Sequence, residues 1–271
     1  MMLINSLMVA RLFLIGALVF FPDVSWAVSW QEEKGKHFII RTAGEDAEVW
    51  AKEVLRHAED YYRTIAQEID YPRYDDFWTW DERVSITVYP DKQTFLEATG
   101  QPEWSMGGAI HRPRHEHKRT IVTYKQEENF LDGLLPHEIS HLMLIDYIGE
   151  KYPIPIWLNE GVAQLQEKDR RPKADILMRQ LVTANQAIPF DELFETDIRQ
   201  ETETLRVAVF YSQSVSIVDF LITDYGSKKF GLLLRQLRDG KDFEEALGTT
   251  YATTVPSIEE LEKKWVSYMK K

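Results

Sequence analysis

The sequence predicts an α+β fold in which a mixed α/β front half leads into an all-helical back half. Short runs with strand-like alternation occur only before residue 125, whereas helical periodicity of 3.6 residues dominates after residue 156. No low-complexity tract, internal repeat or long linker interrupts the chain. We therefore expect one domain over residues 28–270, with a front part at about 28–150 and a back part at about 151–270.

The front half alternates between strands and helices. We expect strands at residues 37–41, 84–89, 109–110 and 120–124, and a long amphipathic helix at 43–68. Asp91 is a suitable N-cap for a short helix that contains Phe95. The strand at 120–124 is either an ordinary strand of the sheet or an edge strand that pairs with an extended peptide.

The back half consists of helices with apolar stripes. They are expected at residues 156–168, 173–185, 205–225, 227–238, 242–247 and 257–269. Gly226 and Gly240 stand where helix C-caps are expected.

The junction between the halves carries the motif His137-Glu138-Ile139-Ser140-His141. Residues i and i+4 share a helix face, so two imidazoles converge on one point, with a carboxylate beside them. The motif is flanked by apolar residues: Leu134, Leu135, Leu142, Met143, Leu144 and Ile145. A helix this apolar is buried, and a metal ion would satisfy its polar side chains.

The start of this helix has two readings. Asp132 can act as the N-cap, which puts Pro136 in the first turn, where a missing N–H costs little. A helix that began near Gln126 would instead be kinked at Pro136. We favour the first reading.

A third candidate ligand lies downstream, in the segment Trp157-Leu158-Asn159-Glu160-Gly161. Residues 142–159, 18 in number, separate His141 from Glu160. A catalytic zinc ion takes three protein ligands, which Glu160 would complete. The alternative is a carboxylate favoured by the dipole at the start of a helix.

The H-E-x-x-H motif, the 18-residue spacer and the W-L-N-E-G segment together resemble the gluzincins, especially the aminopeptidase-N-like group and the peptidase MA-like proteins. The resemblance implies a two-lobed zincin fold with Zn²⁺ at the floor of a cleft, held by His137, His141 and Glu160. Glu138 would be the general base that activates a zinc-bound water for attack on a peptide carbonyl.

Two further residues are candidates for supporting roles at the site. The resemblance implies that Tyr211, in a long helix, stabilises the oxyanion, although a tyrosine there is also common as a core residue. Glu167 lies seven residues after Glu160 and can orient a ligand histidine, or it is a surface carboxylate. The position where thermolysin-like enzymes carry Asp is Gln164 here.

The substrate class is narrowed by an absence in the sequence. Aminopeptidase-N-like enzymes place an amine-binding Glu before the zinc helix, but the corresponding stretch here, Met106 to Ile110, contains glycines and no acid. We therefore expect an endopeptidase. A histidine-rich stretch nearby, at residues 111–117, lies among arginines, and this composition predicts a solvated loop.

The first 27 residues predict export. Arg11 precedes an apolar run that is too short to span a bilayer comfortably, and Ser25-Trp26-Ala27 offers small residues for cleavage after Ala27. The alternative is an uncleaved anchor. The chain has no cysteine, so its stability must come from its core. We expect a periplasmic or secreted protein without stable membrane insertion after signal cleavage.

The net charge of −12 disfavours nucleic acid and anionic membranes as partners. The leading hypothesis is thus a zinc metallopeptidase with a peptide or protein substrate. Two alternatives stay open: a zinc-binding scaffold that recognises a peptide or cell-envelope partner without catalysis, and a zinc hydrolase that acts on an ester or a cell-wall amide.

Overall fold

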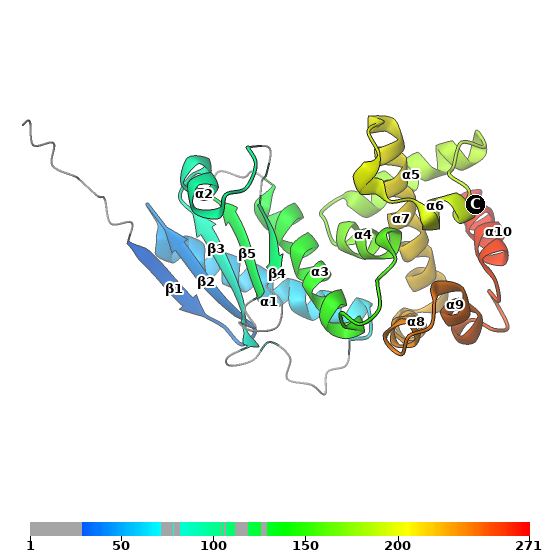
Figure 1. Cartoon of the computed structure of the whole chain (residues 1–271), viewed down its shortest axis with the longest axis horizontal. Coiled ribbons are helices and arrows are strands. Elements are labelled where there is room, and N and C mark those ends of the chain that lie inside the picture. Colours follow the sequence, from blue (N-terminus) through cyan, green and yellow to red (C-terminus); the bar gives the residue numbers. More distant parts are fainter. Residues whose placement is uncertain are drawn as a thin grey trace, which may run out of the picture.

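The computed structural model of the chain describes residues 29–71, 78, 82–103, 105, 107–111, 119–125 and 129–271. A small sheet with its covering helices lies at one end, and helices alone form the other end (Figure 1). The mixed α+β class predicted from the sequence is thereby confirmed. The proposed signal peptide lies outside the described residues.

The described strands form a five-stranded sheet with the order β1-β2-β3-β5-β4. The central pairs, β2–β3 and β3–β5, are parallel, and the outer pairs, β1–β2 and β5–β4, are antiparallel. The strands are β1 (Trp30–Lys34), β2 (Phe38–Ala43), β3 (Val84–Tyr89), β4 (Gly107–His111) and β5 (Arg119–Tyr124).

The helices follow the predicted periodicity with small shifts of their ends. They are α1 (Ala47–Glu68), α2 (Lys92–Thr99), α3 (Leu135–Ile148), α4 (Ile156–Leu165), α5 (Arg170–Thr183), α6 (Phe190–Glu195), α7 (Thr204–Tyr225), α8 (Ser227–Arg238), α9 (Phe243–Thr250) and α10 (Ile258–Met269), with a π-helical segment η2 (Phe130–Leu134) and a 3₁₀ turn η3 (Ile198–Gln200). The sequence did not predict β1, α6, η2 or η3.

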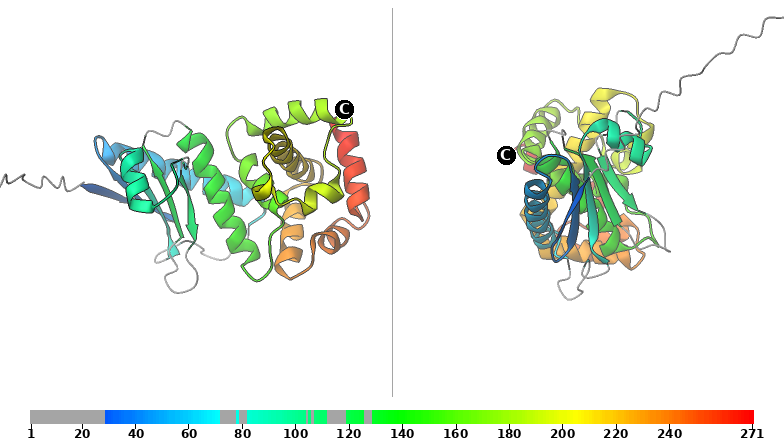
Figure 2. Two further views of the ribbon diagram at one scale, coloured as in Figure 1. Left: turned by 45° about the horizontal axis from the view of Figure 1, so that its top comes forward. Right: turned by 90° about the vertical axis from the view of Figure 1, so that its left-hand side faces the viewer.

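The two faces of the sheet are covered by different helices. On β5, Ile121 points into the main core, whereas its neighbour Val122 packs with Phe95 of α2 on the opposite face. Helix α1 packs against β1 and β2, and α3 contacts both α1 and β4, as the two views in Figure 2 show. Helix α3, which carries the H-E-x-x-H motif, is therefore held directly against the sheet.

The edge-strand reading of residues 120–124 is wrong. β5 lies between β3 and β4, so its backbone hydrogen bonds are used on both sides. The strand at this edge of the sheet is β4. A long-range choice of strand neighbour of this kind has no signature in local alternation.

One ion pair and one hydrogen bond fix α3 in place. Arg119 of β5 binds Asp146 of α3 at 2.6 Å, and Asp146 has a side chain only 7% exposed. The next residue, Tyr147, donates its hydroxyl proton to the carbonyl of Gly231 in α8, at 3.1 Å. These contacts tie α3 to the sheet on one side and to the C-terminal helices on the other.

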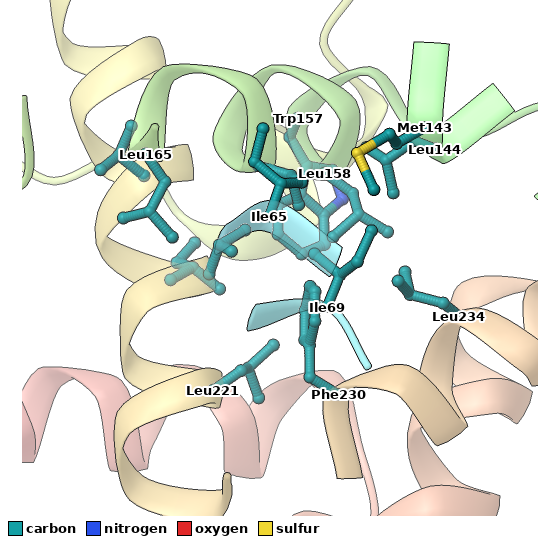
Figure 3. Packing of buried hydrophobic residues seen from close by; sticks show 14 of the residues in the cluster. Ile65, Ile69, Met143, Leu144, Trp157, Leu158, Leu165, Leu221, Phe230 and Leu234 are labelled. Atoms are coloured by element: carbon teal, nitrogen blue, oxygen red, sulfur yellow. The ribbon is translucent and has the colours of Figure 1, made fainter. Parts of the chain in front are cut away.

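A continuous hydrophobic core joins the two ends of the molecule. Figure 3 shows Ile65 and Ile69 of α1 beside side chains of α3, α4, α7 and α8. Trp157 of α4 is almost completely buried there. The helices that carry the candidate site are thus part of the main hydrophobic core, which limits how far their side chains can move.

Among the described residues, α7 is the helix long and apolar enough to cross a membrane, judged by length and composition. Within its most apolar window, 61% of the residues are buried inside the protein. It packs against α4, α5 and α8. Its apolar composition is therefore accounted for by its place in the core.

Candidate metal centre

The two histidines of the motif lie one turn apart on α3 and face the same point. Their Nε2 atoms are 3.0 Å apart. The apolar residues that predicted a buried helix, such as Ile139 and Leu142, are buried on its other faces. The burial of these side chains leaves His137 and His141 on the face that points toward α4.

Glu160 approaches the same point from α4. Its Oε1 atom is 3.7 Å from Nε2 of His141, and its Oε2 atom is 4.0 Å from Nε2 of His137. The side chains of His137, His141 and Glu160 are 17%, 15% and 22% exposed. The three residues thus form a half-buried cluster whose donor atoms lie within 4.8 Å of one another.

Both imidazoles are held from behind through their Nδ1 atoms. Nδ1 of His137 lies 2.8 Å from Oε1 of Glu167, and Nδ1 of His141 lies 3.0 Å from Oδ1 of Asn159. The sequence left open whether Glu167 orients a histidine or is a surface carboxylate. In the structure it makes the contact with His137. Asn159 was not anticipated, although its place directly before Glu160 was visible in the sequence.

The hydrogen bonds at Nδ1 leave both Nε2 atoms facing the cluster. Carboxylate and amide oxygens only accept, so a neutral imidazole held in this way carries its proton on Nδ1 and presents a lone pair at Nε2. Two Nε2 atoms 3.0 Å apart, beside a carboxylate, are ligand atoms that a cation between them would take. Tetrahedral zinc places its ligand atoms roughly 3.3 Å apart, close to the spacings seen here. The donor set therefore fits Zn²⁺.

Neighbouring carboxylates also act on the charge of His137. Burial by itself lowers the pKa of His137, but the hydrogen bond to Glu167 and the negative charges of Glu138, Glu167 and Glu160 outweigh it and raise the pKa. Glu138 is thus close enough for its charge to raise the pKa of His137, as its position next to His137 in the motif predicts.

The segment after α4 that carries Glu167 is anchored on η2. Its Lys168 N–H donates to the carbonyl of Asp132 at 2.8 Å, and Lys168 Nζ binds the Asp132 carboxylate at 2.6 Å. The predicted N-cap role of Asp132 is therefore wrong: the helical path begins earlier, at Phe130, and the side chain of Asp132 makes no cap. The wider turns of a π-helix leave carbonyls available for such contacts, and π-segments are frequent at functional sites.

Tyr211 lies on α7, which packs closely against α4. A Cβ atom on Gly161 would be 2.7 Å from the backbone oxygen of Ser214, so only glycine allows this approach. Burial raises the pKa of Tyr211, the charge of Glu160 raises it further, and the charge of Arg170 lowers it. The phenol is therefore close enough to Glu160 for the carboxylate to raise its pKa.

A cavity of about 510 Å³ lies at the N-terminal end of α4. Proline, aromatic and acidic side chains line it, among them Phe194, Phe243, Glu195 and Glu244. None of the three clustered residues lines it. Of the histidine-rich stretch, residues 112–118 lie outside the described part of the chain, so its expected loop conformation stays a prediction.

Two histidines on a buried helix, joined by a carboxylate from the next helix, form an arrangement typical of metal-dependent hydrolases. The chain belongs to the Peptidase MA superfamily, whose family model matches residues 79–271. The matched region runs from just before β3 to the end of the chain, and so includes every residue of the cluster. No curated protein matches the chain. Peptidases of this superfamily are typically zinc-dependent and act on peptides or proteins.

Proposed function

We propose that the protein is a zinc-dependent endopeptidase of the gluzincin type. The observation that carries the proposal is the cluster of two Nε2 atoms and one carboxylate, with both Nδ1 atoms occupied behind it. His137, His141 and Glu160 would hold the ion. When bound there, Zn²⁺ would polarise water and the substrate carbonyl.

Glu138 is the proposed general base. It follows His137 directly on α3, so it stays beside the cluster while leaving the ligand positions to the imidazoles. Its carboxylate accepts a proton from the attacking water and passes that proton to the leaving amine nitrogen.

Tyr211 is the proposed oxyanion donor. Its raised pKa keeps the phenol protonated at neutral pH, so that the hydroxyl donates a hydrogen bond. A donor of this kind is worth about 3 kcal/mol in a preorganised site. The approach of α7 to α4 at Gly161 supports this role, because it brings Tyr211 to the side of Glu160.

The endopeptidase assignment depends on what the chain lacks. No acid occurs between residues 106 and 110, where an aminopeptidase would bind the substrate amine. An extended peptide bound across the cluster would then have no acidic group that holds its N-terminal amine. Internal bonds would therefore be cleaved.

The test is the substitution Glu138→Gln. The variant should bind one zinc ion per chain, as the wild type should. Its rate of peptide hydrolysis should fall by at least about a thousandfold, since the proton acceptor is gone. The matched control is Glu53→Gln, on an exposed position of α1. Zinc content is measured by metal analysis and hydrolysis with a quenched peptide library, with and without chelator.

The outcomes separate the alternatives. A Glu138→Gln variant that hydrolyses peptides like the wild type would refute the mechanism. A wild type that binds zinc and hydrolyses no peptide would favour the non-catalytic scaffold. A wild type that hydrolyses only esters or cell-wall amides would favour the zinc hydrolase that acts on another bond.

We further propose that the protein is exported and cleaved after Ala27. The apolar run before Pro22 supports this, together with the small residues before the cleavage point. N-terminal sequencing of protein recovered from the cell envelope or medium should begin at Val28. An intact N-terminus in the membrane fraction would favour the uncleaved anchor instead.

A further inference from the structure

Arg170, the first residue of α5, has a half-buried side chain that pairs with no group in the described part of the chain. Its Nε atom is buried and has no hydrogen bond. Among the arginines in the described part of the chain, it is the one for which the structure gives neither a side-chain hydrogen bond nor an ion pair. A buried N–H without an acceptor is costly, so Nε of Arg170 is free to donate to a ligand.

The adjacent residue shows the contrast. Arg171 binds Glu68 at the end of α1 and Asp219 of α7, the latter at 3.2 Å. The chain carries 44 acidic against 32 basic residues, so acceptors for a guanidinium are abundant. Arg170 nevertheless pairs with none of them in the described structure.

The place of Arg170 relates it to the metal centre. Its backbone N–H donates to the carbonyl of Glu167 at 3.2 Å, in the turn that presents Glu167 to His137. Its positive charge lowers the pKa of the Tyr211 phenol, whereas the negative charge of Glu160 raises that pKa. Helix α5 packs along α7. Arg170 thus lies at the border of the cluster, on the side of the proposed oxyanion donor.

We propose that Arg170 is a substrate-binding residue that recognises a carboxylate of the peptide. A planar guanidinium binds a carboxylate with two parallel hydrogen bonds, which gives both affinity and direction. The carboxylate comes either from the C-terminus of the peptide or from an Asp or Glu side chain. This inference rests on the proposed peptidase function and specifies its substrate class.

The first experiment compares matched substrates. N-acetylated hexapeptides of Ala, Leu and Phe are prepared with a C-terminal acid or a C-terminal amide. A second pair, both amidated, carries Glu or Gln at one internal position. The variants are Arg170→Gln, Arg170→Lys and the control Arg171→Gln, whose thermal unfolding is compared with that of the wild type.

The expected result is a change in substrate preference and not a general loss. Wild type should prefer one carboxylate-bearing peptide over its neutral partner by about tenfold or more in kcat/KM, mainly through KM. Arg170→Gln should abolish that preference, so that the ratio of kcat/KM between the carboxylate peptide and its neutral partner falls to about one. Arg170→Lys should retain part of it, and Arg171→Gln all of it. Preference for the C-terminal acid or for the internal Glu identifies the source of the carboxylate.

A binding measurement keeps the inference separate from turnover. Fluorescence anisotropy of the same labelled peptides is measured with Glu138→Gln and with Glu138→Gln/Arg170→Gln, zinc-loaded and metal-free. The carboxylate peptide should bind the single variant about tenfold more tightly than the double variant. Equal binding, or a carboxylate preference that persists without Arg170, overturns the inference. If the proposed peptidase function is wrong, the wild type will hydrolyse none of the peptides, and this result is distinct from the binding measurement.

Discussion

Replacing Gly161 with alanine tests the contact on which the geometry of the centre depends. The added Cβ would lie 2.7 Å from the backbone oxygen of Ser214, and 2.9 Å from both its carbonyl carbon and a methyl group of Val218. A relaxed contact is about 3.5 Å, so α7 would have to move by roughly 0.5–0.8 Å. Because the obstacle is backbone, rotation of a side chain cannot relieve it.

The expected cost follows from two opposing effects. Alanine favours a helix over glycine by about 1 kcal/mol. Overpacking of a core contact costs about 1–3 kcal/mol and more when backbone must shift. We therefore expect Gly161→Ala to lower the free energy of unfolding by about 1–2 kcal/mol, which lowers Tm by roughly 2–8 °C for a chain of this size.

Function should suffer more than stability. Tyr211 lies three residues before Ser214, on the same side of α7, so displacement of α7 moves the phenol away from Glu160. We expect kcat to fall by at least about tenfold, with KM nearly unchanged, since the interaction is proposed for the transition state.

The assay is thermal unfolding of metal-free protein followed by circular dichroism, together with steady-state hydrolysis of the zinc-loaded protein. Gly108→Ala is the matched control for stability, because an added Cβ there meets no atom within 4 Å. A Gly161→Ala protein that unfolds at or above the wild-type temperature would refute the close-contact argument, since the gain in helix propensity would then be unopposed.

Three further predictions concern the surroundings of the centre. Glu167→Gln should weaken zinc binding by about 10- to 100-fold in a chelator competition, because the ligand imidazole loses its carboxylate acceptor; unchanged affinity would deny the contact its orienting role. Arg119→Gln should lower the free energy of unfolding by about 3 kcal/mol in urea, because the buried Asp146 is left without its cation; a change below about 1 kcal/mol would contradict this. Burial by itself raises the pKa of Glu59, but hydrogen bonds from His37 hold it below its ordinary value of 4.5. The stability that these hydrogen bonds contribute is present above pH 4.5 and is lost as the pH falls through the lowered pKa. Glu59→Gln should therefore lose less stability than the wild type between pH 6 and pH 3.

The cluster itself was accessible from the sequence because its geometry is mostly local. The i and i+4 positions of His137 and His141 share a face of any α-helix, whatever surrounds it. Glu160 required only that two consecutive helices pack antiparallel, which a short proline-containing connection favours. Local periodicity predicted the helices on both sides for the same reason.

The contacts that were missed depend on segments distant in the sequence. Placing β5 inside the sheet and β4 at its edge requires knowledge of strand pairing, which alternation of apolar residues does not contain. The anchoring of Lys168 by Asp132 joins segments 36 residues apart. Asp132 has the residue type and the position of an N-cap, and only the π-helical start of the segment directs it elsewhere.

Glu167 shows how a correct assignment can have a different physical cause. The sequence argument placed it on the face of a helix that ran to residue 168, but α4 ends at Leu165. Its N–H donates to the carbonyl of Gln164 at 3.2 Å, so the chain tightens there into a 3₁₀-type turn. The two contacts between Lys168 and Asp132 then hold this turn over α3. Glu167 therefore reaches His137 from a loop that η2 anchors, and shortening or relaxing η2 would release the imidazole without altering any residue of the cluster.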